Sequence, residues 1–108
     1  MKFKILFLVV ASVLISSCSS SDKPSSAEEY MEIADKNIDQ ENYYKALVNY
    51  KGLVDNYPKS DLIPKASFEL GKLYHGQVDK NLSAQKSYQN AVKYYMKVCS
   101  EYPEFDGS

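Results

Sequence analysis

The sequence of 108 residues contains no tryptophan and no arginine, and it has only one histidine and two cysteines. With a single histidine, His75, a catalytic base cannot be oriented by a second imidazole. The two cysteines, Cys18 and Cys99, provide no zinc-binding spacing. The sequence also lacks a glycine-rich phosphate loop, a serine-centred nucleophile elbow and a cluster of metal-ligating residues. We therefore predict that the chain is not an enzyme, and we expect no catalytic residue, no metal site and no cofactor.

His75 and Cys99 are the two side chains with catalytic potential in the expected helices, and a structural role accounts for each of them. His75 precedes Gly76 at the expected end of a helix, where a histidine interacts favourably with the helix dipole. Cys99 has no local signature of a nucleophile and lies beside a stripe of tyrosine and valine. We expect it to be a small buried or half-buried thiol.

The charge of the chain also excludes a class of partner. Thirteen lysines are balanced by fourteen acidic residues, so the net charge is close to −1. A nucleic-acid-binding protein needs an excess of basic groups to neutralise phosphates. We therefore expect no nucleic-acid partner.

The N-terminal segment has the organisation of a secretory signal. Lys2 and Lys4 form a short basic head, an apolar run extends from residue 5 to residue 15, and small residues follow. The run is too short to cross a bilayer, which requires a helix of about 20 apolar residues. We predict that residues 1–17 are a signal peptide.

The end of this signal carries the string Ile15-Ser16-Ser17-Cys18. It resembles the bacterial lipobox, in which an aliphatic residue and two small residues precede a cysteine. The resemblance implies that the Cys18 thiol receives a diacylglyceryl group, that the signal is cut before Cys18, and that the new amine is acylated. The alternatives are an ordinary signal peptide with a chance cysteine, or an uncleaved anchor. With Cys18 lipidated, Cys99 would have no partner for an intramolecular disulfide.

A polar segment separates this cysteine from the rest of the chain. Residues 18–26 comprise the lipidated cysteine and a run of serine, aspartate, lysine and proline, which reads as a flexible tether. Each buried methylene of an acyl chain contributes roughly 0.8 kcal/mol, so two or three chains hold a protein firmly on a membrane. Ser19 is not acidic, and by resemblance to bacterial lipoproteins this favours the outer membrane, on the side facing the periplasm.

Beyond the tether, apolar residues recur at the three- and four-residue steps of helices. We predict an all-α domain over residues 27–108. Ser26 and Glu29 fit a capping box that begins a helix reaching residue 40. A second helix begins near Tyr43 and ends at Tyr57-Pro58. Two further helices are expected. The third is capped by Asp61, has Pro64 in its first turn and stops at Gly76, and the fourth runs from about Asn81 to Tyr102.

The apolar positions define the expected core of this domain. They are Tyr30, Ile33 and Ala34 in the first helix, Tyr43, Ala46, Leu47, Tyr50, Leu53 and Val54 in the second, Ala66, Leu70, Leu73 and Tyr74 in the third, and Ala84, Tyr88, Ala91, Tyr95, Val98 and Tyr102 in the fourth.

The second half of the domain repeats the first. Tyr43, Ala46, Tyr50, Leu53 and Tyr57-Pro58 return at the same offsets as Tyr88, Ala91, Tyr95, Val98 and Tyr102-Pro103. Self-similarity of this kind indicates stacked helical hairpins. We therefore expect about four antiparallel helices arranged as two hairpins.

These residues resemble the tetratricopeptide repeat, whose first-helix signature matches Leu70-Gly71 and Tyr74. Two departures stand out. The first repeat has Ala34 and Asn37 in place of the glycine and tyrosine, and the second has seven extra residues between Tyr74 and Tyr88. Seven residues are two helical turns, so the extra residues could extend a helix with Ala84 and Ala91 on one face. Alternatively, residues 70–88 resemble a Sel-type repeat, which has a longer loop.

The resemblance implies a binding groove lined by the first helix of each pair. The positions of this sequence that match the groove positions of the family are Glu28, Met31, Asp35 and Ile38 in the first repeat and Lys65, Phe68, Lys72 and His75 in the second. This mixture of apolar and charged groups suits an extended peptide or a partner helix better than a small-molecule substrate. Alternatively, Met31, Ile38 and Phe68 pack between helices.

A tetratricopeptide-like domain behind a lipobox also resembles the lipoprotein that takes part in assembling outer-membrane β-barrels, although that family has about five repeats. The resemblance implies a membrane-anchored scaffold that binds an envelope protein or peptide. The alternative is a structural spacer without a dedicated groove. Because two hairpins bury one shared interface, we also expect the isolated domain to be weakly stable, or to associate with a partner or a second copy of itself.

Overall fold

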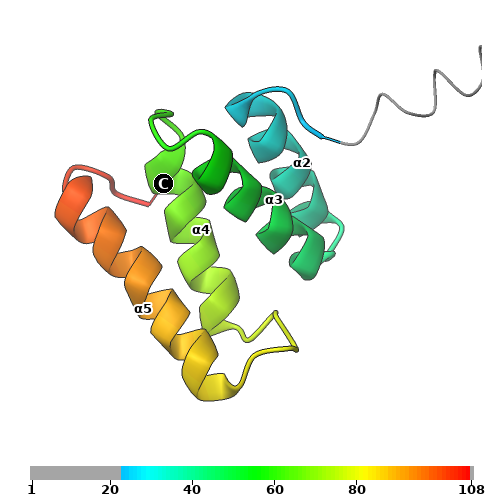
Figure 1. Ribbon diagram of the computed structural model, residues 1–108, viewed down its shortest axis with the longest axis vertical. Helices are drawn as coiled ribbons and strands as arrows, with labels where there is room; N and C mark the ends of the chain where they lie inside the picture. The colour runs from blue at the N-terminus through cyan, green and yellow to red at the C-terminus, as the bar shows by residue number, and fades with distance from the viewer. Residues whose placement is uncertain (1–22, 108) are drawn as a thin grey trace, which may run out of the picture.

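The computed structural model describes residues 23–107, and the proposed signal peptide and Cys18 lie outside this range. Four α-helices occupy the described range and no strand occurs within it: α2 (Ala27–Asp39), α3 (Tyr43–Asn56), α4 (Ile63–His75) and α5 (Ala84–Glu101). Each helix packs against the next, so that α2 and α3 form one hairpin and α4 and α5 form another (Figure 1). Within the described residues, no helix is both long and apolar enough to span a membrane. The prediction of four helices in two hairpins is confirmed.

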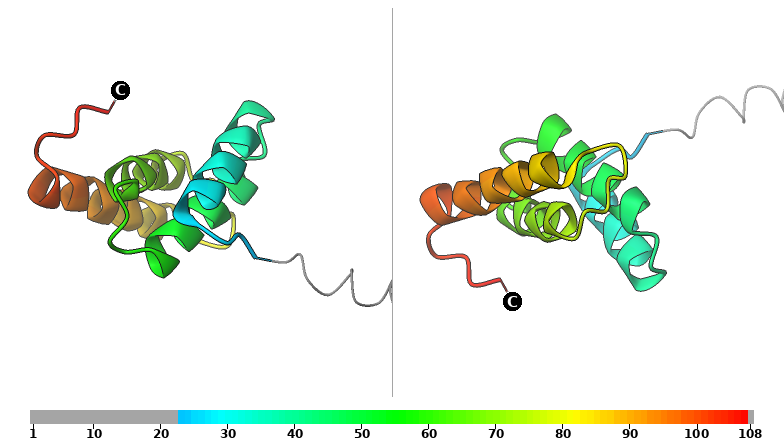
Figure 2. Two further views of the ribbon diagram at one scale, coloured as in Figure 1. Left: turned by 90° about the horizontal axis from the view of Figure 1, so that it is seen from above. Right: turned by 90° about the horizontal axis from the view of Figure 1, so that it is seen from below.

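The two hairpins lie side by side with their helices in corresponding places. Both views along the molecule show α2 and α4 on one side and α3 and α5 on the other (Figure 2). Most of the contact between the hairpins is made by α3 and α4. The first helix of each hairpin therefore contributes to one shared face of the domain, which we call the groove face.

The start of α2 follows the predicted cap with one change. Ser26 Oγ accepts a hydrogen bond from the Glu29 amide at 3.1 Å. The Glu29 carboxylate accepts from the amide and hydroxyl of Ser25, at 3.3 and 2.8 Å, rather than from the Ser26 amide as a capping box requires. Two exposed glutamates, Glu28 and Glu29, still lie in the first turn, where the helix dipole favours negative charge.

The prediction that Asp61 caps α4 is wrong. The N-cap position is Leu62, and no side chain there bonds to the helix. The hydroxyl of Ser60 accepts from the Leu62 amide at 3.0 Å, so a serine turn satisfies the backbone before the helix begins. Pro64 lies in the first turn and Gly76 ends the helix, as predicted.

The seven extra residues of the second repeat do not extend a helix. They lie in the loop of residues 76–83, and α5 begins at Ala84 rather than near Asn81. Asp79 Oδ1 accepts from the Asn81 amide at 3.0 Å, and Ser83 Oγ caps α5 by accepting from the Lys86 amide at 3.1 Å. These local bonds hold the backbone out of a helix, as the longer-looped alternative implies.

The core lies where the helices face one another. Tyr50, Leu53, Ile63 and Leu70 are at most 1% exposed. Alanines at equivalent positions of the two hairpins, Ala46 and Ala91, are buried as predicted. Two glycines let tyrosine rings of the neighbouring helices lie close to the backbone. An added Cβ would lie 2.5 Å from the ring of Tyr95 at Gly71 and 2.5 Å from the ring of Tyr30 at Gly52.

Several predicted core residues lie at the surface instead. Tyr43 and Ala84 are the first residues of their helices and are exposed. Tyr88 is 45% exposed, and its hydroxyl accepts from Gln77 Nε2 at 3.0 Å. The buried tyrosine of α5 is Tyr94, which stacks on Tyr74 with the ring centroids 5.8 Å apart.

Cys99 is exposed, contrary to the prediction of a buried or half-buried thiol. It follows Val92 and Met96 along the outer face of α5, and these two side chains are 53% and 64% exposed. In α3, Leu47 and Val54 are equivalent to Val92 and Cys99, and they pack into the core because α4 follows them. Lys51, the equivalent of Met96, is exposed. Within the described chain no helix follows α5, so its outer face has nothing to pack against.

Candidate partner-binding groove

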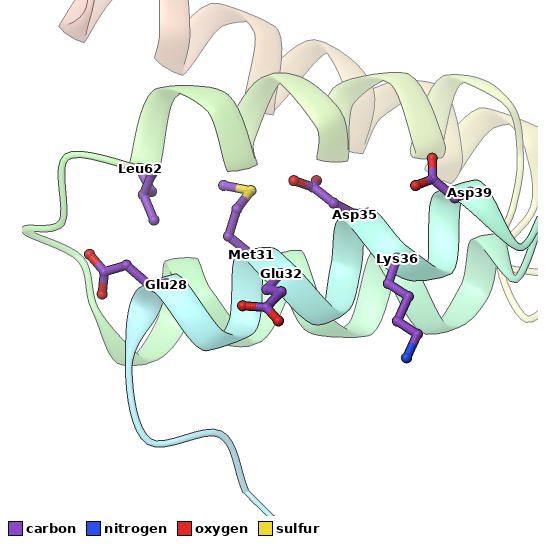
Figure 3. A pocket seen from close by; sticks show the side chains of 7 residues that line it. All are labelled: Glu28, Met31, Glu32, Asp35, Lys36, Asp39 and Leu62. Atoms are coloured by element: carbon purple, nitrogen blue, oxygen red, sulfur yellow. The ribbon is translucent and has the colours of Figure 1, made fainter.

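A hollow of about 500 Å³ lies on the groove face of the first hairpin. We call it the α2 hollow, and it is lined by Glu28, Met31, Glu32, Asp35, Lys36, Asp39 and Leu62. Met31 is only 7% exposed, while charged side chains surround it. Figure 3 shows that the side chains of Met31, Asp35 and Asp39 point from α2 towards α4. The hollow therefore has a buried thioether between carboxylates.

Three of the four groove residues predicted in the first repeat line this hollow, namely Glu28, Met31 and Asp35. Ile38 does not line it, because that side chain packs against the core. Four lining residues were not predicted: Glu32, Lys36, Asp39 and Leu62. Glu32 and Asp39 lie one helical turn from Glu28 and Asp35, so the α2 period could have indicated them. Lys36 is adjacent to Asp35 and has no such spacing to a predicted position. Leu62 comes from the turn before α4, and no periodic pattern indicates its position.

Asp35 connects three helices at the wall of the α2 hollow. Its Oδ1 accepts a hydrogen bond from the Tyr50 hydroxyl of α3 at 2.6 Å. Its Oδ2 lies 3.6 Å from Lys65 Nζ of α4, and both side chains are nearly half exposed. A pair this exposed contributes at most about 1 kcal/mol to stability. Its main consequence is geometric, because it joins the predicted groove positions of the two repeats.

The environment of Tyr50 keeps its hydroxyl protonated. Burial, and then the hydrogen bond to the negatively charged Asp35, raise the pKa of Tyr50 well above its usual value. Burial likewise raises the pKa of Tyr74 and of Tyr94. The neutral tyrosines therefore contribute to the folded state.

We expect the domain to lose stability in alkaline solution. A raised folded pKa contributes stability that is fully present below the unfolded value of about 10 and is lost as the pH rises above it. The free energy of unfolding should thus be level up to about pH 9 and fall beyond pH 10. Tyr50→Phe should reduce that fall by up to about 1.4 kcal/mol per pH unit. Urea unfolding followed by circular dichroism between pH 8 and 11 measures both slopes. Identical slopes for the two proteins would contradict the role of Tyr50.

The predicted groove residues of the second repeat form a row along α4 rather than a hollow. We call Lys65, Phe68, Lys72 and His75 the α4 row. Phe68 is half-buried, with its ring centroid 5.9 Å from that of Tyr95, and Lys72 Nζ lies 5.1 Å from the same Phe68 centroid. His75 is exposed at the end of the helix, 5.9 Å from the ring of Tyr88. Phe68 and Met31, at equivalent positions, thus differ in how they pack.

Charge is divided between the two halves of the groove face. The α2 hollow has four carboxylates and one lysine among its lining residues. The α4 row has two lysines, and Lys72 also pairs with Glu69 at 2.9 Å. Between residues 23 and 107, no group of three histidine, cysteine, aspartate or glutamate side chains could hold a metal ion. The face therefore offers charge, an aromatic ring and a buried thioether to a partner.

Comparisons of the chain with protein families, with curated proteins and with solved structures find no match. The lipobox and the tetratricopeptide-like repeats accordingly rest on the residues quoted above, and they stay predictions.

Proposed function

We propose that this chain is a lipid-anchored protein of the bacterial cell envelope whose helical domain binds a protein partner on its groove face. The observation that carries the binding role is the division of charge across that face, with an acidic α2 hollow around Met31 and a basic α4 row around Phe68. The lipobox at Cys18 supports the anchor. Ser19 favours attachment to the outer membrane, where a role in outer-membrane assembly would follow from the resemblance.

The groove face favours a particular class of partner. An extended segment or a helix would place basic groups over the carboxylates of α2 and acidic or aromatic groups over α4. The two halves would fix its direction, because the reversed partner would meet like charges. A small-molecule substrate would use only one half of this face.

Charge reversal on the rim of the α2 hollow tests this role. Glu28 and Glu32 are exposed, so Glu28→Lys and Glu32→Lys should leave the helices intact. The double variant should recover at least fivefold less partner when the lipidated protein is crosslinked and captured from its own envelope. Glu41→Lys is the matched control, since Glu41 lies in the exposed α2–α3 turn and has the same charge.

The alternative function, a structural spacer, predicts a different outcome. A spacer has no dedicated groove, so the double variant and the control would recover the same proteins in the same amounts. That result, with circular dichroism showing intact helices, would contradict the binding role.

The outer face of α5 leads us to expect self-association. Tyr88, Val92 and Met96 lie one turn apart along α5, and each is more than 40% exposed. An apolar stripe of this kind favours contact with another surface. Residues 19–108 should therefore sediment as more than a monomer, or melt at low temperature, and Val92→Lys with Met96→Lys should favour the monomer. A strictly monomeric domain that melts well above about 65 °C would contradict this expectation.

A further inference from the structure

The chain does not end with α5 but turns back onto the groove face. Its C-terminal tail, residues 102–107, begins where the Tyr102 amide donates to Val98 O at 2.9 Å. The Phe105 amide then donates to Tyr102 O at 3.0 Å, which reverses the chain after Pro103. Both views along the molecule show the tail on the side of α2 and α4 (Figure 2).

The tail packs on Phe68 of the α4 row at two points. The ring of Phe105 meets the ring of Phe68 with the centroids 5.7 Å apart and the planes at 63°. Gly107 lies so close that an added Cβ would contact the Phe68 ring at 3.4 Å. Its φ of +79° is a conformation that favours glycine. The backbone and a side chain of the tail therefore both cover Phe68.

Phe68 lies where the repeat pattern places a partner-contacting residue. Its equivalent in the first hairpin is Met31, in the α2 hollow. In the second hairpin the tail takes the place that a partner would occupy. The tail turns over residues 102–105, and its aromatic residue, Phe105, lies between two carboxylates, Glu104 and Asp106. Lys65 and Lys72 lie about one turn either side of Phe68 on the same face of α4.

We propose that Phe68, together with Tyr95 and Lys72, forms a binding site for a short non-helical peptide that carries an aromatic residue flanked by acidic residues, and that the C-terminal tail is its intramolecular occupant. A partner peptide of this class binds by displacing the tail. The inference rests on the proposed function, because it concerns the same groove face, and it names the chemistry of the partner segment.

The tail does not fill the space beside the first turn of α4. A hollow of about 380 Å³, lined partly by Pro64, Pro103 and Glu104, remains between the tail and the first turn of α4. The hydrogen bond from Phe105 to Tyr102 lies within the tail itself. A segment tethered this closely acts at an effective concentration of order millimolar. It therefore excludes weak ligands, whereas a partner that also engages the α2 hollow can displace it.

Binding of the tail sequence in trans tests the site directly. The probe is a fluorescently labelled peptide with the sequence of residues 101–107, and the readout is fluorescence anisotropy with the lipidated chain in detergent micelles. The protein variant ends after Pro103, which leaves α5 complete because that helix ends at Glu101. A second variant, Phe105→Ala, keeps the full length. Circular dichroism checks that both variants retain their helices.

The tail-less variant should bind the peptide between about twofold and tenfold more tightly than the intact chain, the range that corresponds to one aromatic contact. Phe105→Ala should show an intermediate affinity. Phe68→Ala in the tail-less chain, or alanine in place of phenylalanine in the peptide, should remove binding. Equal binding by the intact and tail-less chains, no binding to the tail-less chain, or binding that survives Phe68→Ala would overturn the proposal.

These outcomes are distinguishable from failure of the proposed function. If the peptide binds the tail-less chain as expected while the charge-reversal variants still capture the same envelope proteins, the site on Phe68 stands and the role of the α2 hollow fails. If capture depends on Glu28 and Glu32 but the peptide does not bind, the groove stands and the tail proposal fails.

Discussion

Replacing Ala91 with leucine should lower the melting temperature of the helical domain by about 4–24 °C. Ala91 is 3% exposed in α5, on the side that packs against α4. Three extra carbon atoms have no space there, and overpacking of this kind costs about 1–3 kcal/mol. In a domain of this size, each kcal/mol shifts the melting temperature by about 4–8 °C.

Two comparisons separate packing from helix propensity. Val92→Leu changes the next residue, which is 53% exposed, and should leave the melting temperature almost unchanged. Ala46→Gly, in the equivalent position of α3, should cost only about 1 kcal/mol through lost helix propensity. Thermal melts by circular dichroism measure all three variants. Equal melting temperatures for Ala91→Leu and Val92→Leu would show that Ala91 does not lie at the contact between α4 and α5.

Replacing Cys18 with serine should abolish attachment of lipid to the protein. A serine hydroxyl cannot form the thioether that holds the diacylglyceryl group in lipoproteins. Cys99 cannot substitute, because it lies far from the signal in the sequence and on α5 of the folded domain. We expect the variant to be found as a soluble form or a signal-retaining form.

Membrane fractionation after growth with labelled fatty acid measures this effect. The wild-type protein should carry label and pellet with membranes. Cys99→Ser is the matched control, since it removes the other thiol and should keep both label and membrane attachment. Label in the Cys18→Ser variant would show that the lipobox assignment is wrong.

The helix boundaries that the sequence predicted correctly are those set by local chemistry. Tyr57-Pro58, Gly76 and Pro103 end or interrupt helices through backbone restrictions that do not depend on the rest of the fold. The start of α5 could not be predicted by periodicity, because seven residues fit two helical turns as well as they fit a loop. The bonds made by Asp79 and Ser83 decide between these conformations, and only the structure shows them.

The exposed residues of α5 show a second limit of sequence patterns. Val92 and Cys99 lie on an apolar stripe, and the repeat predicts that this stripe is covered, as its equivalents Leu47 and Val54 are in α3. A terminal helix has no successor within the described chain, so the same pattern gives an exposed face. On the groove face, the repeat pattern correctly predicted three residues that line the α2 hollow, namely Glu28, Met31 and Asp35. The contact of Phe105 with Phe68 did not, because it spans 37 residues and depends on how the chain turns after α5.

The most direct test of the binding role is site-specific photo-crosslinking in living cells that produce the lipidated protein. A photoreactive amino acid at Glu32 places the probe on the α2 hollow, and one at Lys72 places it on the α4 row. Glu41, in the exposed α2–α3 turn, provides the control position. We predict that the Glu32 and Lys72 positions yield an adduct with the same envelope protein and that Glu41 yields none. Adducts that are equally abundant from all three positions, or absent from both groove positions, would contradict the account.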